Sequence, residues 1–354
     1  MEMLFPFDQP ATGNKLLGRK EEIQAVIDTL TVKQKGVAIY AAPKSGKNTV
    51  VREALHRLKT SGWPFRLCEI DFFNVRTLQE FIDCFKRRML DCYEQMNRDA
   101  ILPFTVESDN IPDAKVLDLP SIIVRESGAT LVVYLKEFQN VISIDEKGFR
   151  LEDLVKTWLK QTNVRYIITG SAVNTMKSVF EEKQIFYYLT DVIELKPIPQ
   201  KSVVDYITSS FLNVGRVIER DDAEEVCRIT GCNMWYVKMM CSICYTLPIG
   251  YVNRSAILQT RDALLQVFAP QFRRTMLELT PNQINFLRAI CEGARRLSSS
   301  EILARYHLNS SANVFRLKDA FRNKELVTFD RNDEPQILDP VFEYWLKNKY
   351  FKQV

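Results

Sequence analysis

Lys47 is the residue of this sequence with the clearest chemical use, because it stands between an apolar strand pattern at 36–40 and a helical pattern. In such a strand–loop–helix arrangement, successive backbone N–H groups and the helix N-terminus bind phosphate oxygens, and the lysine reaches the terminal phosphates. The sequence therefore predicts a phosphate-binding loop, with nucleotide contacts from Pro43, Lys44, Ser45, Gly46, Lys47, Asn48 and Thr49.

This loop departs from the pattern G-x-x-x-x-G-K-[S/T] at two positions. Ala41 replaces the first glycine, and Asn48 replaces the hydroxyl residue that binds Mg²⁺. Asn48 could still offer its amide oxygen to Mg²⁺, and Thr49 could contact the α-phosphate. The alternative is an ordinary turn between a strand and a helix, without a ligand.

A second apolar run, at 131–135, ends where a P-loop ATPase places its Mg²⁺-site aspartate, often followed by a glutamate that polarises water. Here Lys136 occupies the aspartate position and Glu137 follows it. At an effective dielectric near 20, two unit charges 4 Å apart interact by about 4 kcal/mol, so this lysine opposes Mg²⁺ binding. Alternatively, Lys136 pairs directly with phosphate or extends away. Glu137 and Lys47 are the catalytic candidates if hydrolysis occurs.

The elements that would position these residues alternate between strand and helix. Further strands are predicted at 65–73, 164–171 and 191–195, and helices at 77–95, 120–126 and 150–161, with a loop over 96–112. This order predicts an α/β fold with a parallel sheet flanked by helices.

The strand pattern stops at Pro197, and a helical segment follows to about Pro270. Three further helices and a β-hairpin, over 282–338, predict a winged helix. The expected domains are a P-loop NTPase core at 1–196, a helical lid at 197–275 and a winged-helix domain at 276–354.

Composition indicates an ordinary soluble protein, with 46% hydrophobic and 26% charged residues among 354. No apolar run approaches the roughly 20 residues that cross a bilayer, and no secretory signal is apparent, so a cytoplasmic location is predicted.

Cys227, Cys232, Cys241 and Cys244 include a C-x-x-C spacing, but their apolar helical context favours buried thiols over a metal site.

Taken in order, several short motifs resemble the archaeal-type ATPases of the STAND branch of AAA+ proteins. They span nearly the whole chain and comprise Leu17 to Glu21, Ala41 to Thr49, Glu137 to Gln139, Thr169 to Ser171 with Met176, Ile193 to Pro197, Thr230 with Gly231, and Asp339 to Trp345.

The resemblance implies that Gly18 and Arg19 lie beside the adenine or ribose of ATP or ADP, and that Thr169 or Ser171 is a sensor. It also implies the helical lid. The chain departs from the family at 232–234, where Gly-Asn-Pro is usual.

The third helix of the winged helix carries basic residues that we expect on its outer face, namely Arg316, Lys318, Arg322 and Lys324. They could meet DNA phosphates, but Asp330, Asp333 and Glu334 in the wing turn would repel them. In the resembling family this module often contacts protein or is autoinhibitory, so a protein client is also expected, and an oligomer is compatible with the sequence.

The function expected from these features is an ATP- or ADP-binding molecular switch with weak or absent ATP hydrolysis. The rival is a catalytically inactive protein-interaction or DNA-binding winged-helix protein that retains the NTPase fold.

Overall fold

The computed structural model describes residue 5, residues 16–99 and residues 113–352. Its contacts divide the chain into two units, one built from residues 19–43 and 47–195 and the other mainly from residues 196 onward.

The N-terminal unit is built on a five-stranded sheet in the order β2-β3-β4-β1-β5, and every neighbouring pair is parallel. Its strands are β1 Gly36–Tyr40, β2 Phe65–Asp71, β3 Thr130–Lys136, β4 Val164–Gly170 and β5 Thr190–Glu194. All of β1 and the apolar run at 131–135 are buried, as expected of strands covered on both faces. The predicted parallel α/β fold is confirmed.

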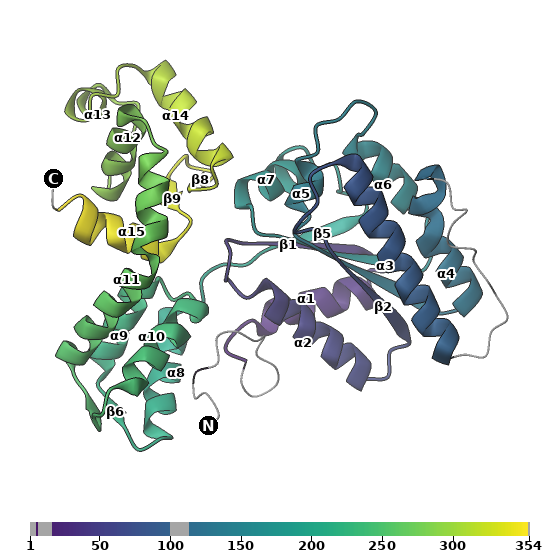
Figure 1. Ribbon diagram of the computed structural model, residues 1–354, viewed down its shortest axis with the longest axis horizontal. Coiled ribbons are helices and arrows are strands. Elements are labelled where there is room, and N and C mark those ends of the chain that lie inside the picture. Colours follow the sequence, from purple (N-terminus) through teal and green to yellow (C-terminus); the bar gives the residue numbers. More distant parts are fainter. Residues whose placement is uncertain (1–4, 6–15, 100–112, 353–354) are drawn as a thin grey trace. The chain divides into compact units, whose positions relative to one another are not determined.

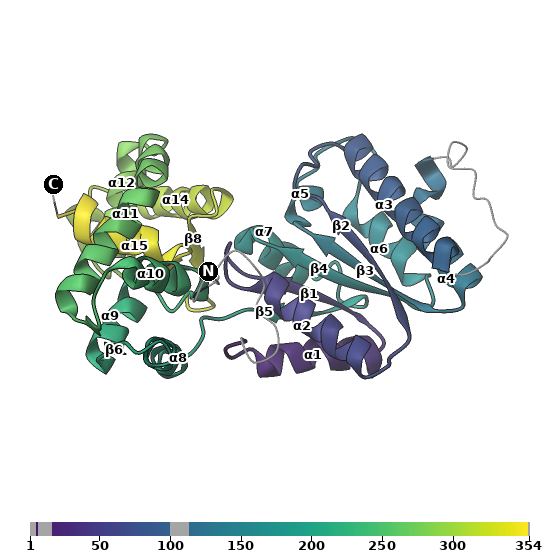
Figure 2. The same ribbon diagram turned by 60° about the horizontal axis from the view of Figure 1, so that its bottom comes forward.

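Helices cover both faces of this sheet. In both views α1 and α2 lie on one side, and α3, α4 and α6 lie on the other (Figures 1 and 2). The helical bounds are α1 Lys20–Thr31, α2 Lys47–Thr60, α3 Leu78–Asp99, the 3-10 helix η3 Asp113–Asp118, α4 Leu119–Ser127, α5 Gln139–Ile142, α6 Leu151–Leu159, α7 Val173–Lys177 and the π-helical η4 Ser178–Glu182.

The loop predicted over 96–112 is wrong at its start. Helix α3 continues to Asp99, and residues 100–112 lie outside the described residues. The polar composition that suggested a loop is also what the solvent side of an amphipathic helix requires.

The C-terminal unit opens with four helices, α8 Gln200–Leu212, α9 Arg220–Thr230, α10 Met234–Thr246 and α11 Arg254–Leu277. The expectation of no further strand before the winged helix is wrong in detail, because β6 Val217–Ile218 pairs in parallel with β7 Tyr251–Val252. Two residues per strand are too few for an alternating pattern to be visible in a sequence.

Pro270 does not end a helix, contrary to expectation, but lies inside α11. The missing N–H and the ring of a proline weaken a helix interior. Phe268, Phe272 and Met276 are nevertheless buried along this helix, and their packing outweighs that cost. Because α11 continues through position 275, the domain boundary proposed there falls within a continuous helix and stays a prediction.

The last part of the chain has the helices and hairpin of a winged helix, as predicted. Its elements are α12 Pro281–Cys291, α13 Ser300–Arg305, α14 Ser311–Asn323, the antiparallel strands β8 Val327–Phe329 and β9 Pro335–Ile337, α15 Pro340–Trp345 and the π-helical η5 Leu346–Tyr350. A capping box between Thr280 and Gln283 begins α12. Helix α15 begins at the Asp339–Pro340 motif, because the Asp339 side chain accepts hydrogen bonds from two N–H groups of the first helical turn.

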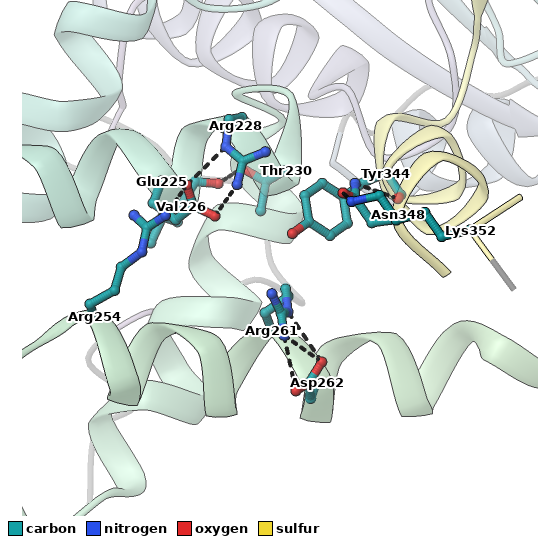
Figure 3. Close-up of polar contacts among 10 residues, drawn as sticks. All are labelled: Glu225, Val226, Arg228, Thr230, Arg254, Arg261, Asp262, Tyr344, Asn348 and Lys352. Carbon is teal, nitrogen blue, oxygen red and sulfur yellow. Dashed lines mark hydrogen bonds and ion pairs between the residues drawn. The ribbon is translucent and has the colours of Figure 1, made fainter. Parts of the chain in front are cut away.

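Arginines from two helices converge on one buried carboxylate in this unit (Figure 3). Glu225 of α9 forms ion pairs with Arg228 of the same helix and, at 3.0 Å, with Arg254 of α11. The guanidinium of Arg228 also lies 5.6 Å from the ring centre of Tyr344 in α15. Burial raises the pKa of Glu225, but the two arginines outweigh that effect and the pKa is lowered, so the carboxylate stays charged and joins the helices.

Candidate nucleotide-binding site

The loop between β1 and α2 contains few glycines, so a residue other than glycine must adopt part of its left-handed backbone conformation. Lys44 and Gly46 adopt left-handed conformations, with φ of 65° and 91°. Gly46 therefore stands where a glycine is needed. Ala41 is not among the residues with positive φ, which explains why alanine can replace the glycine of the usual pattern.

Lys47 lies at the start of α2 with 7% of its surface exposed. Its ammonium donates hydrogen bonds to the carbonyl oxygens of Ala41, at 2.8 Å, and Ala42, at 3.1 Å. Burial lowers the pKa of Lys47 to about 8, and the charge of Glu137 partly opposes this shift. The ammonium is thus held inside the loop by neutral oxygens, and phosphate oxygens would be stronger acceptors.

Glu137 follows β3 in a left-handed conformation, with φ of 53°. Its Oε2 accepts hydrogen bonds from the Ser171 hydroxyl at 2.5 Å and from the Gln139 amide at 2.7 Å. The Ser171 backbone N–H in turn donates to Gln139 Oε1 at 3.1 Å. The ends of β3 and β4 are therefore joined by a polar cluster of Glu137, Gln139 and Ser171, whose carboxylate interacts with the charge of Lys47.

Thr169, the other sensor candidate, is placed differently. Only 1% of its surface is exposed, and its hydroxyl donates to the Leu135 carbonyl at 3.4 Å. This hydroxyl is engaged within the sheet, whereas that of Ser171 lies in the polar cluster. Ser171 is therefore the better placed of the two.

The residues where an NTPase would bind Mg²⁺ form a different network. Lys136 forms an ion pair with Glu69 of β2 at 2.9 Å, and Arg52 of α2 contacts the same carboxylate at 2.7 Å. The amide oxygen of Asn48 accepts a hydrogen bond from the Tyr134 hydroxyl at 2.6 Å. A Mg²⁺ role for Asn48 would require breaking that bond.

These residues do not fit Mg²⁺. The ion needs oxygen ligands, usually including a carboxylate, but the Lys136 position supplies an ammonium. Across residues 16–99 and 113–352, no group of three or more histidine, cysteine, aspartate or glutamate side chains is arranged to hold a metal.

Three partners in this network, Glu69, Arg52 and Tyr134, were not predicted from the sequence, and Gln139 of the polar cluster was noted only as part of a motif. The register of β2 and β3 explains why Glu69 and Tyr134 lie here. Glu69 is paired with Tyr134, and the next pair on the same face of the sheet is Asp71 with Lys136. A lysine at a strand end facing an acidic neighbouring strand is the signal that could have identified Glu69.

Gly18 and Arg19, the residues expected beside the nucleotide base, are consecutive left-handed residues before α1, with φ of 65° and 67°. Arg19 also forms an ion pair with Glu22 at 2.8 Å. Its contact with adenine or ribose stays a prediction.

The basic face predicted for α14 is wrong for Lys318. This side chain is 8% exposed and forms an ion pair with Asp333 of the wing turn, because the two charges stabilise each other there. Arg322 lies 4.8 Å from the ring centre of Phe329 and pairs with Asp319 at 3.4 Å. Of the four predicted residues, Arg316 and Lys324 are the exposed ones.

Comparisons with known proteins agree with this architecture. Residues 270–348 match the model of a probable winged helix domain. A search among curated proteins finds no match. Within the described part of the chain, none of the helices combines the length and apolar character that a membrane crossing requires.

Several solved structures are similar over nearly the whole chain. The Walker-type ATPase of Pyrococcus abyssi has a TM-score of 0.73 at 16% identity, covering 98% of this chain and 100% of that one. The Aeropyrum pernix ORC2 protein, in its ADPNP–ADP complexes, has a TM-score of 0.59 at 13% identity, with 98% of each chain covered. The Aeropyrum pernix ORC1 protein in complex with DNA has a TM-score of 0.51 at 13% identity, covering 96% of this chain and 95% of that one.

At these identities the likeness establishes the fold and leaves the activity open. The chain shares its fold with the Walker-type ATPase of Pyrococcus abyssi and the ORC2 protein of Aeropyrum pernix, and residues 270–348 form a winged-helix domain.

Proposed function

We propose that this protein is a molecular switch that binds ATP or ADP without requiring Mg²⁺. The observation that carries the proposal is the buried Lys47 ammonium, which is held by loop carbonyls and acts electrostatically on Glu137. A P-loop lysine in this position supports polyphosphate binding. The nucleotide complexes of the ORC2 relative support the choice of an adenine nucleotide.

In the proposed switch, the ammonium of Lys47 exchanges the carbonyls of Ala41 and Ala42 for phosphate oxygens. The loop N–H groups bind further oxygens, and the ion pair of Lys136 with Glu69 takes the place of a metal site. A polyphosphate beside Lys47 also changes the electrostatic potential at Glu137. This carboxylate accepts hydrogen bonds from Gln139 and from Ser171, which follows β4. Nucleotide binding would thereby bias the arrangement of this polar cluster.

Hydrolysis is expected to be slow or absent for two reasons. The site has no residue set suited to Mg²⁺, so metal stabilisation of phosphate charge is missing. In addition, Oε2 of Glu137 already accepts two hydrogen bonds, from Ser171 and Gln139, which compete with the orientation of an attacking water.

Calorimetric titration of the full chain with ATP and with ADP, each in Mg²⁺ and in EDTA, tests the proposal. We expect binding of both nucleotides, with dissociation constants that differ by less than about three-fold between the two buffers, because no side chain favours the metal. Absence of heat at millimolar nucleotide would refute the switch, and a requirement for Mg²⁺ would refute metal-independent binding.

Nucleotide affinity should also fall as the pH rises above about 8. Lys47 has its pKa lowered to about 8 by burial, so its charged form is lost as the pH passes that value, although bound phosphate will raise the pKa again. Titrations from pH 7 to 10 should show a decline for the native protein. A Lys47→Arg variant that still binds should stay flat, because arginine keeps its charge; a parallel decline in both proteins would contradict this assignment.

The second candidate is a protein-interaction or DNA-binding protein that keeps the fold without nucleotide. The observation favouring it is the ion pair of Lys136 with Glu69 at the usual metal position. Arg316 and Lys324 would then be the exposed side chains for phosphate contact. The calorimetric experiment separates the two candidates, since this one predicts no nucleotide binding.

A further inference from the structure

Two cysteines of the C-terminal unit are held at the turn that ends α9. Cys227 lies in the last turns of the helix, and Cys232 follows Gly231, the left-handed residue that caps it. The backbone N–H of Cys232 donates to the Cys227 carbonyl at 3.2 Å, and the N–H of Gly231 donates to the same oxygen. A single backbone hydrogen bond thus joins the two residues across one turn, and disulfides require such closeness, with α-carbons about 4.4–6.8 Å apart.

A side-chain hydrogen bond also joins the two thiols. This bond raises the pKa of Cys227 and lowers that of Cys232. Cys227 is 2% exposed, whereas Cys232 is only partly buried. Cys232 is therefore both the more accessible and the more readily ionised sulfur, which are the properties of an attacking thiolate.

The other cysteines lack this combination. Cys241 and Cys244, the C-x-x-C pair, are each 1% exposed within α10. Cys68 and Cys92 also interact with each other, but they are 2% and 8% exposed. Solvent oxidants reach buried thiols poorly, so these residues serve as internal comparisons.

The turn between Cys227 and Cys232 also packs against the start of α15. A Cβ atom on Gly231 would lie 2.4 Å from Cβ of Pro340, so the backbone of this turn contacts the first turn of α15 directly. The Tyr236 hydroxyl donates to Asp339 at 2.8 Å beside it. A covalent bond across this turn would fix the surface on which the Asp339–Pro340 segment is seated.

We propose that Cys227 and Cys232 are a reversible dithiol–disulfide pair that responds to peroxide. The Cys232 thiolate attacks one oxygen of hydrogen peroxide, the O–O bond breaks, and hydroxide leaves a sulfenic acid on Cys232. The Cys227 sulfur then attacks the Cys232 sulfur, the S–S bond forms, the S–O bond breaks, and water leaves with the thiol proton. Two thiols lose two electrons, and one peroxide becomes two waters.

Peptide mapping of the full chain after brief exposure to hydrogen peroxide tests this proposal. Arg228 separates the two cysteines, so trypsin places Cys227 in the peptide 221–228 and Cys232 in the peptide 229–238. After the remaining thiols are blocked with N-ethylmaleimide, we expect these two peptides to be joined, and dithiothreitol to separate them. The joined pair should exceed any other cysteine pairing about ten-fold, because Cys232, among the cysteines that the structure describes, combines partial exposure with a lowered pKa and a partner thiol.

Two variants sharpen the experiment. Cys232→Ser should abolish the joined peptides and leave Cys227 as a thiol, whereas the matched Cys244→Ser, in the same unit, should leave the joined pair unchanged. Recovery of Cys232 in the native protein as an unlinked thiol or as sulfinic acid overturns the proposal. So does a preferential link between peptides 67–76 and 89–98, which carry Cys68 and Cys92.

Discussion

Replacing Lys47 by methionine should weaken the binding of ATP and ADP by about 100-fold. Hydrogen bonds to charged groups contribute about 1.5–3 kcal/mol each, and Lys47 is the buried cation of the loop. Methionine has a similar length and no charge, so the loop keeps its packing and loses its phosphate contact. The measurement is calorimetric titration with each nucleotide in EDTA, where metal cannot contribute.

Lys59→Met is the matched control. Lys59 lies on the same helix, α2, but is exposed, so its charge is screened by solvent. We expect its replacement to change affinity by less than about two-fold. Similar losses in both variants would mean that nucleotide responds to overall charge and that the loop is not the binding site.

The core of the fold could be predicted because its sequence signals are local. Buried strands such as β1 and β3 are continuous apolar runs, and each is followed by a helical pattern, so the parallel α/β order needs no knowledge of distant contacts. The winged helix was equally clear, since three helical patterns are followed by two short strand patterns with a polar turn between them.

Where prediction failed, tertiary packing had overridden a local rule. Pro270 is a helix-breaking residue by itself, yet α11 continues because Phe268 and Phe272 are buried on either side of it. The strands β6 and β7 pair across 32 residues of helix and turn, and two residues of strand carry no pattern of their own.

The candidate site shows the same division. Lys47, Glu137 and Ser171 were predicted from motif positions, and the structure places them in contact or electrostatic range. The partners of Lys136 and Asn48 depend on strand register, which a single sequence does not state. Glu69 neutralises Lys136 from the adjacent strand, and Tyr134 donates a hydrogen bond to Asn48 from a position 86 residues away. Lys318 was assigned to the wrong environment for the same reason, because the wing residue Asp333 folds back onto it.

Restoring the two missing metal-site groups, by Lys136→Asp together with Asn48→Thr, should create a dependence on Mg²⁺. The new carboxylate would stand beside Glu69, and two like charges about 4 Å apart repel by about 4 kcal/mol at an effective dielectric near 20. We therefore expect a lower melting temperature in EDTA, recovered by Mg²⁺. Binding of ATP should become at least about ten-fold tighter with Mg²⁺ than without it, and hydrolysis should rise above that of the native protein.

The control for this variant is Lys136→Asn with Asn48→Thr, which removes the same ammonium but adds no carboxylate. If the native site is inactive because it lacks a metal ligand, only the aspartate variant will respond to Mg²⁺, and phosphate release will rise only there. If both variants gain activity equally, the changes that they share, loss of the Lys136 charge and a hydroxyl at position 48, are sufficient without a carboxylate. An unchanged rate in both would mean that Glu137, held by Ser171 and Gln139, is the limiting group, and the loss of metal ligands would then be a consequence of inactivity rather than its cause.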